Sequence, residues 1–371
     1  MSRSTPMRED DYTMKTWKFI LYILLLASCN TLETPHALTD VDFPLEQDWS
    51  FTTEEHIQWL SVSDDWAVIS EPLKLTAVDV NSGKLLWSRD LIMDSDSLPL
   101  FSSEFLAVEN MNRVKIINRT GDEVVSFDLD RNDENAELIA FHSPYLFFVR
   151  RPSWVLEIYS IETESKLWSI PIGRGGVNIG FDTFEDISYI TTLSFISAYD
   201  TTNGDLVWEY ERKASTSTFD SGVLYFYEVT SAQNYLSAFD TTAQKNLWQL
   251  EIGASTGFEV YNMTVLGDYL ITATNDGLIA INKTDGRYGW KTESNINFAT
   301  SPIIVDSTIF ARGTSSRTIY AISPASGRYL GILKLDDPPT FGIPDYEFRS
   351  AVMATGKSIL FYYDRNVYSY K

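Results

Sequence analysis

One short segment returns along most of the chain. At residues 196–208 it reads Ile-Ser-Ala-Tyr-Asp-Thr-Thr-Asn-Gly-Asp-Leu-Val-Trp, and aligning its variants on the Asp places a turn residue about every 41 residues. Each turn residue can accept a hydrogen bond from the backbone two residues later, which favours chain reversal. A repeat of this length must bury its apolar face against its neighbours, so the chain has to form an array. The seven turn residues are Asp79, Asn118, Ser160, Asp200, Asp240, Asn282 and Ser323.

Each repeat predicts a β-hairpin. Before the turn, a large aliphatic residue stands first and an apolar residue third, which predicts a strand with one face buried against a neighbouring sheet. Four repeats place glycine four residues after the turn residue, where a positive φ is expected, and Gly121 does so after a one-residue deletion. Glu164 and Gln244 stand there in the remaining two, so we expect those two turns to differ. The four glycines are Gly83, Gly204, Gly286 and Gly327.

A tryptophan follows the turn residue by eight positions in most repeats. These residues are Trp87, Trp168, Trp208, Trp248 and Trp290, while Val125 and Gly331 take the place in two weaker copies. Both ends of the chain carry half a repeat. Residues 367–370 form one more strand before the chain stops at Lys371, and Trp49 has no strand of its own repeat ahead of it. We therefore expect the two ends to pair and to close a ring of eight units.

The space between each tryptophan and the next turn holds two more strands, for example at 301–306 and 307–312. Four strands per unit is the propeller arrangement. The segments are β-branched, aromatic and interrupted by turns, which disfavours a helical solenoid. The sequence thus predicts an all-β fold over residues 48–371, an eight-bladed β-propeller of four-stranded antiparallel blades.

The spacing Asp-x-x-(Thr/Ser)-Gly-x-x-x-Trp resembles the PQQ-like repeat of the tryptophan-docking β-propellers. The resemblance implies that Trp49 and the five other repeat tryptophans pack on the next blade and are structural. Two classes of protein carry this repeat. Quinoprotein dehydrogenases hold pyrroloquinoline quinone and Ca²⁺, often beside a vicinal disulfide, whereas BamB-type lipoproteins of outer-membrane assembly are propellers without a cofactor. The chain has one cysteine and no matching cofactor cluster, so we expect the second class, no enzyme activity and no cofactor.

The N-terminus predicts a signal peptide over residues 1–28, with Met14 as an alternative start. Nine apolar residues at 19–27 would rise only about 14 Å as a helix, too little to span a bilayer. Residues 26–29 read Leu-Ala-Ser-Cys and resemble the bacterial lipobox, which implies lipidation of Cys29. Residues 29–47 would then form the lipidated cysteine and a flexible tether. The expected location is extracytoplasmic, anchored in the cell membrane or the outer membrane of a bacterium.

The net charge of the chain argues against some classes of binding partner. The net charge is −22, from 51 acidic and 29 basic residues, which argues against nucleic acid or anionic lipid as the partner of a broad face. The three histidines are scattered, so they predict no metal cluster. We expect a monomeric chain that meets the membrane through the lipid on Cys29 and binds protein partners in the cell envelope.

Two segments do not repeat. Asp128, Asp130 and Asn132 give a weak match to the start of a Ca²⁺ loop, but glycine and the final Glu are missing, so a solvated loop between blades is favoured. The segment 336–348 is rich in Pro and aromatic residues. Phe341, Tyr346 and Phe348 could meet a partner there, or could instead cover the closing blade.

These expectations combine into one functional hypothesis, a lipid-anchored, non-enzymatic scaffold that binds envelope proteins, with outer-membrane protein assembly as its setting. A surface module for ligand binding or adhesion is the first alternative. A PQQ-dependent dehydrogenase is the second.

Overall fold

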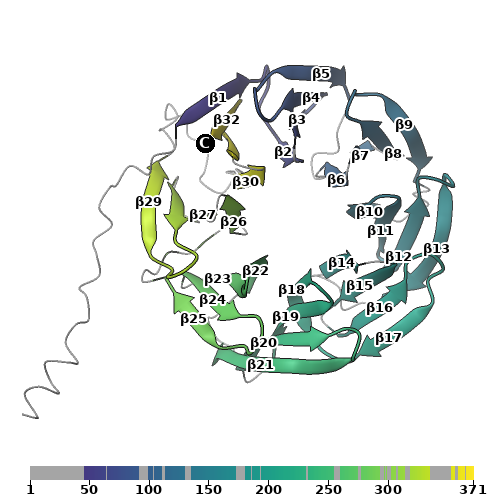
Figure 1. Ribbon diagram of the computed structural model, residues 1–371. Coiled ribbons are helices and arrows are strands. Elements are labelled where there is room, and N and C mark those ends of the chain that lie inside the picture. Colours follow the sequence, from purple (N-terminus) through teal and green to yellow (C-terminus); the bar gives the residue numbers. More distant parts are fainter. Residues whose placement is uncertain are drawn as a thin grey trace, which may run out of the picture. The chain divides into compact units, whose positions relative to one another are not determined.

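Eight four-stranded antiparallel sheets follow one another around a ring in the computed structural model (Figure 1). The chain divides into two units, Met1–Val41 and Asp42–Lys371, and the described residues belong to the second. The structure describes residues 46–371 except 64, 92–98, 103, 111–112, 130–134, 173–179, 185, 193, 231–232, 255–259, 275–276, 293–295, 297, 299–301, 306–307, 314–317, 335–351, 356–357 and 364.

Each blade contributes four strands, numbered along the chain from the ring axis outward, and the last blade borrows its outer strand from the N-terminal end. The innermost strands are β2 (Trp59–Val62), β6 (Leu100–Ser102), β10 (Asn135–His142), β14 (Gly180–Phe184), β18 (Ala214–Asp220), β22 (Val260–Leu266), β26 (Ile303–Val305) and β30 (Val352–Thr355). The second strands are β3 (Trp66–Glu71), β7 (Phe105–Asn110), β11 (Tyr145–Arg151), β15 (Ile187–Thr191), β19 (Val223–Val229), β23 (Tyr269–Thr274), β27 (Thr308–Arg312) and β31 (Ser358–Tyr363).

The predicted hairpins form the outer half of each blade. The third strands are β4 (Lys74–Asp79), β8 (Arg113–Asn118), β12 (Val155–Ser160), β16 (Ile196–Asp200), β20 (Gln233–Asp240), β24 (Gly277–Asn282), β28 (Thr318–Ile322) and β32 (Asn366–Tyr370). The outer strands are β5 (Leu85–Asp90), β9 (Glu123–Asp128), β13 (Ser165–Pro171), β17 (Leu206–Tyr210), β21 (Lys245–Ala254), β25 (Tyr288–Lys291), β29 (Tyr329–Lys334) and β1 (Gln47–Thr52). The predicted eight-bladed propeller is confirmed.

The two ends of the described chain close the ring. Strand β1 pairs antiparallel with β32, with Trp49 opposite Ser369 and Phe51 opposite Val367. Beyond the strands, the amides of Glu46 and Lys371 each donate to the carbonyl of the other at 3.1 Å. The closure forms as expected, and within the described residues the pairing reaches Glu46.

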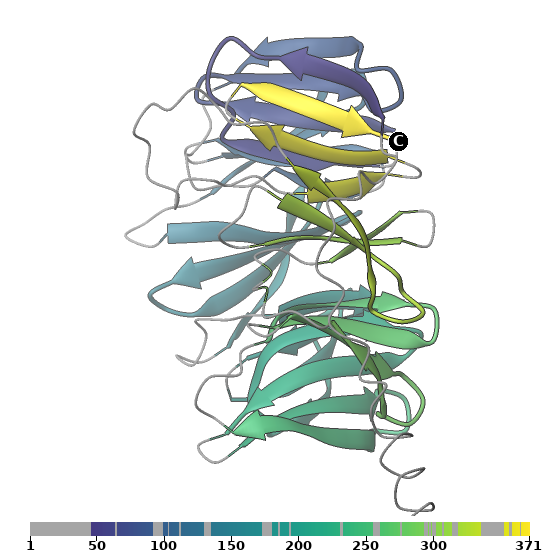
Figure 2. The same cartoon turned by 90° about the vertical axis from the view of Figure 1, so that its left-hand side faces the viewer.

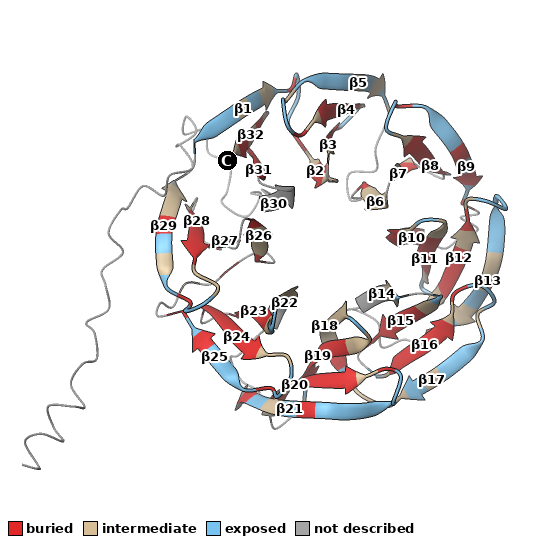
Figure 3. Ribbon diagram, viewed as in Figure 1, coloured by how far each residue is buried: buried red, intermediate tan, exposed pale blue. Residues whose placement is uncertain are grey.

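Most third strands bury both faces, so the expectation of one buried face was wrong for them, whereas β32 alternates between buried and intermediate residues. In β4, Leu75, Thr76, Ala77 and Val78 are all buried. Neighbouring blades cover the two sides of each third strand, whereas the outer strands keep an exposed side (Figure 3). Small residues such as Ala77 therefore mark close packing between blades, not the core side of a half-exposed sheet.

The propeller has two faces, which Figure 2 shows edge-on. One carries the hairpins predicted from the repeat together with the turns between first and second strands. In the first blade the Val80 amide donates to the Asp65 carbonyl at 3.1 Å and joins these two turns. We call this the turn face. The opposite side carries the hairpins between second and third strands and the links between blades, and we call it the link face. There the Leu91 amide donates to the Leu73 carbonyl at 3.0 Å.

Every outer strand has a one-residue β-bulge just before the tryptophan position. In β5, Trp87 lies opposite Ala77 while Leu85 lies opposite Val78, so Leu86 is the extra residue. A bulge bends and twists a strand, which aims the following indole at the next blade and interrupts the free sheet edge. The extra residues are Asp48, Leu86, Val124, Leu167, Val207, Leu247, Gly289 and Leu330.

Indoles dock on glycines at five seams between blades. At one of them Gly204 has φ 79°, and a Cβ added there would lie 2.6 Å from Cδ2 of Trp168. The Trp168 indole N–H donates to the Thr201 carbonyl at 2.9 Å, which fixes the ring on the turn. The other pairs are Trp49 with Gly83, Trp87 with Gly121, Trp248 with Gly286 and Trp290 with Gly327, with indole bonds of 2.6–2.9 Å to the turn backbone.

The turns at Glu164 and Gln244 keep the left-handed backbone, so the expectation that they would differ was wrong in that respect. Their φ values are 52° and 51°. The blade before Glu164 has Val125 at the tryptophan position. The blade before Gln244 has Trp208, which packs on Phe239 at a centroid distance of 5.2 Å. Glycine is thus paired with a docked indole, while the turn itself tolerates a side chain.

Ion pairs cross two seams on the turn face. Arg119, just after the turn residue of its blade, pairs with Asp65 of the preceding blade. Lys283 holds the same position and reaches Asp220 of the preceding blade, with Nζ and Oδ2 2.5 Å apart. The hydrogen bond from Lys283 lowers the pKa of Asp220 below its usual value of 3.8. Both side chains of this pair are less than a third exposed.

The indole contact predicts unequal effects of alanine at two glycines with positive φ. Gly204→Ala should lower the free energy of unfolding by about 2–4 kcal/mol, because left-handed strain adds to a clash with Trp168. Gly222→Ala is the matched control: its φ is 82° and nothing lies within 4 Å of the added Cβ, so about 1–2 kcal/mol of strain is expected. Urea denaturation measures both. Equal losses would contradict the docking account.

The Asp220–Lys283 pair predicts a pH dependence. Because the folded pKa of Asp220 is depressed, its contribution is fully present above about pH 4 and is lost as the pH falls through the folded pKa. Lys283→Met should flatten the acid limb of the stability profile by about 1 kcal/mol or less, since both groups are partly solvated. Thermal melts between pH 6 and pH 2 measure the limb, with exposed Lys84→Met as control. An equal acid slope in Lys283→Met and the wild type would refute the assignment.

Candidate functional site

The structure describes few of the residues singled out as functional from the sequence. Cys29, Asp130 and Asn132 lie outside the described residues. The same holds for Phe341, Tyr346 and Phe348. Asp128 ends β9, where it pairs with Arg113, and the hydrogen bond from that guanidinium lowers its pKa. Asp128 therefore already has a cationic partner, and the Ca²⁺ loop stays an untested hypothesis.

Two features are absent from the described residues. No group of three or more His, Cys, Asp or Glu side chains in this part of the chain is placed to hold a metal ion. Within the same residues, no helix has the length and apolarity to cross a membrane. The repeat tryptophans sit on the outer strands, facing the seams, and Trp49 lies on β1.

The seam between β14–β17 and β18–β21 is built differently from those with docked indoles. Six aromatic rings form a ladder across it, with successive centroids 4.8–6.0 Å apart. The ladder runs from Phe184, exposed at the end of β14, to Tyr210 at the end of β17. Ring packing of this kind contributes about 0.5–1.5 kcal/mol per pair beyond burial. Its members, in order, are Phe184, Phe219, Tyr189, Trp208, Phe239 and Tyr210.

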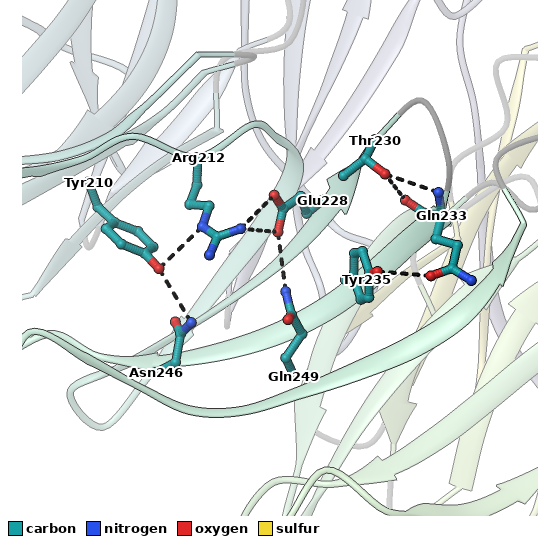
Figure 4. Close-up of polar contacts among 8 residues, drawn as sticks. All are labelled: Tyr210, Arg212, Glu228, Thr230, Gln233, Tyr235, Asn246 and Gln249. Carbon is teal, nitrogen blue, oxygen red and sulfur yellow. Dashed lines mark hydrogen bonds and ion pairs between the residues drawn. The ribbon is translucent and has the colours of Figure 1, made fainter.

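A polar network continues this seam on the link face (Figure 4). Arg212, in the link after β17, donates Nη1 to Oε1 of Glu228 at 3.1 Å and Nε to the Tyr210 hydroxyl at 3.2 Å. The bond to Tyr210 and the carboxylate of Glu228 raise the pKa of Arg212. Asn246 of β21 donates to the same Tyr210 hydroxyl at 3.3 Å. Since Tyr210 and Asn246 belong to different blades, the network fastens one blade to the next.

Glu228 is the buried member of this network. Its side chain is 7 % exposed, against 38 % for Arg212, and Gln249 Nε2 also donates to it at 3.4 Å. A buried carboxylate is stable only when it is paired and hydrogen-bonded, as here. Nearby, the Tyr235 hydroxyl donates to Gln233 Oε1 at 2.9 Å at the start of β20 (Figure 4). These bonds fix the side chains at this end of the blade.

One residue of interest escaped the sequence reasoning. Trp154 lies at the tip of the hairpin between β11 and β12, outside the repeat register, and it has a φ of 55°. Its sequence signal is weak, because Arg151-Pro152-Ser153-Trp154 reads as an ordinary turn. Its positive φ is the feature that distinguishes Trp154 from other hairpin residues.

Comparison with known proteins agrees with the fold. Residues 232–330 match the family model described as outer membrane protein assembly factor BamB. A search of curated proteins finds no match. The solved structure of BamB from Moraxella catarrhalis is similar, with a TM-score of 0.66 and 13% identity over 88% of this chain and 99% of that one.

Two further solved structures share the architecture. The computationally designed Ika8 protein has a TM-score of 0.65 and 13% identity, covering 86% of this chain and 97% of its own. Hsv2 from Kluyveromyces lactis has a TM-score of 0.52 and 10% identity over 72% and 93%. At these identities the structures show the fold alone, whereas the family match concerns the sequence of the repeats. Residues 232–330 thus match the repeat family that the sequence pattern indicated, and the solved structures share the propeller fold.

Proposed function

We propose that this protein is a non-enzymatic, lipid-anchored scaffold that binds other proteins in the bacterial envelope and takes part in outer-membrane protein assembly. The match of residues 232–330 to the assembly-factor family carries this proposal. The ring adds physical support. Closure through β1 and β32 and the interlocked seams give a rigid platform on which loops and hairpin tips hold fixed positions.

Anchoring rests on the N-terminal sequence. Leu26-Ala27-Ser28-Cys29 has the spacing of a lipobox, and a diacylglyceryl group on the cysteine with a further acyl chain would satisfy the need for more than one lipid. The tether would then let the propeller reach partners at the membrane surface. A net charge of −22 disfavours adsorption of the propeller itself on anionic lipid.

Cell fractionation tests the anchor. Wild-type protein should be found with membranes and should incorporate radiolabelled palmitate, whereas Cys29→Ala should do neither, because the thiol that carries the lipid is gone. Ser28→Ala keeps the lipobox pattern and serves as the control. Wild-type protein that stays in the soluble extracytoplasmic fraction without label would contradict the proposal.

Affinity capture tests the scaffold role. Tagged full-length protein, cross-linked in membranes before solubilisation, should recover integral outer-membrane β-barrel proteins or the machinery that inserts them, identified by mass spectrometry. Recovery of none of these, with tagged protein exposed to protease on intact cells, would favour a surface adhesion module. Binding of pyrroloquinoline quinone with dye-linked dehydrogenase activity would overturn the non-enzymatic role.

A further inference from the structure

The hairpin tip between β11 and β12 holds a bulky residue in an unfavourable backbone conformation. Four non-glycine residues in the described chain have positive φ: Trp154, Glu164, Ser221 and Gln244. The last three are polar residues in turns of the turn face. A tryptophan is disfavoured in the left-handed region, and residues kept there cluster at sites where the strain serves a function.

The backbone contacts at this tip do not require an indole. The Trp154 amide donates to the Arg150 carbonyl at 2.9 Å, and the Trp154 carbonyl accepts from the Ile172 amide at 2.8 Å. Leu73 makes the corresponding contact in the first blade, accepting from the Leu91 amide at 3.0 Å. A residue without an aromatic ring therefore supports the same link between hairpin and blade connection.

The side chains at the tip are arranged as an ordered, accessible layer. Trp154 is half-buried and its inner part packs against the core cluster of its blade. The Arg151 guanidinium carbon lies 5.0 Å from the indole centroid, within the range of a cation–π contact. Arg151 also forms an ion pair with Glu137, with Nη2 and Oε2 3.1 Å apart, and both of these side chains are about half exposed. Stacking and pairing hold the guanidinium in place while solvent still reaches it.

Ion pairs lie beside the hairpin tip among the described residues. Arg150 and Lys166 both pair with the buried carboxylate of Glu157, and Arg151 pairs with Glu137. Arg151 is the cationic group at the tip itself, because Lys166 lies opposite Tyr159 toward the turn face. A partner carboxylate can approach the half-exposed guanidinium of Arg151.

We propose that the tip of the β11–β12 hairpin, residues 151–154, is a principal contact for a folded protein partner (Figure 1). The partner would offer an apolar pocket to the Trp154 indole and a carboxylate beside it to Arg151. Tryptophan and arginine are the residues most enriched among those that dominate protein interfaces. This inference rests on the proposed scaffold function and names the surface that performs it.

Trp154→Gly separates a binding role from a structural one. Glycine accepts the positive φ without strain, which offsets part of the packing lost against the core cluster, so the melting temperature should fall by no more than a few degrees. Binding to the outer-membrane assembly protein recovered with the wild type, purified and titrated against the full chain, should weaken at least tenfold because the indole anchor is lost. Arg151→Glu should weaken the same binding, and more strongly at low salt, because it places a like charge opposite the partner's carboxylate.

Two controls match this variant. Gln244→Gly removes a side chain from the same backbone region on the turn face and should leave binding unchanged. Leu73→Gly truncates an exposed apolar residue at the corresponding link-face position of another blade and should also leave the binding unchanged.

Full binding by Trp154→Gly, with capture by the wild type intact, would overturn this inference and leave the proposed function standing. Binding lost only in proportion to a fall in melting temperature would assign Trp154 a structural role. A wild type that captures no assembly protein would refute the proposed function, and this inference with it.

Discussion

The fit of an indole onto a glycine turn is the contact on which the ring depends. A blade on its own exposes both faces of its third strand, as the burial of Leu75 to Val78 between neighbours shows, so no blade can satisfy its core without the next. At five seams the tryptophan that follows the outer-strand bulge reaches across, packs where a Cβ would clash, and hydrogen-bonds to the turn backbone. This contact therefore fixes the distance between neighbouring blades, and its repetition along the chain arranges the blades in a ring.

Seams that lack this contact use other chemistry. Where Gln244 replaces glycine, the Trp208 ring packs against Phe239. The aromatic ladder and the Arg212–Glu228 ion pair join the two blades at this seam. The seams therefore occupy equivalent positions around the ring, but different side chains join the blades at each type of seam. Such local differences give one blade a surface distinct from its neighbours, and they are where a scaffold can acquire a specific partner.

The period of the turn residues and the half repeats at Trp49 and residues 367–370 were enough to predict eight four-stranded blades and their closure, because both follow from counting. Burial of both faces of the third strands could not be read from alternation, since Thr76 and Ser197 look solvent-facing in sequence and become buried only when two blades meet. The bulge at Leu86 was equally hidden, because a one-residue register shift leaves no residue signature. The candidate site was least predictable: Trp154 is marked by a backbone angle, and the sequence around it resembles any turn.

The central claim is that the propeller is a scaffold whose link face meets another envelope protein. Cross-linking mass spectrometry of the tagged full-length chain in native membranes, with an amine-reactive reagent, tests it most directly. The account predicts cross-links to an outer-membrane assembly protein from lysines at the link face, Lys74 and Lys213, and not from Lys84 and Lys245 at the turn face. Cross-links confined to the turn face, or none to any envelope protein, would contradict it.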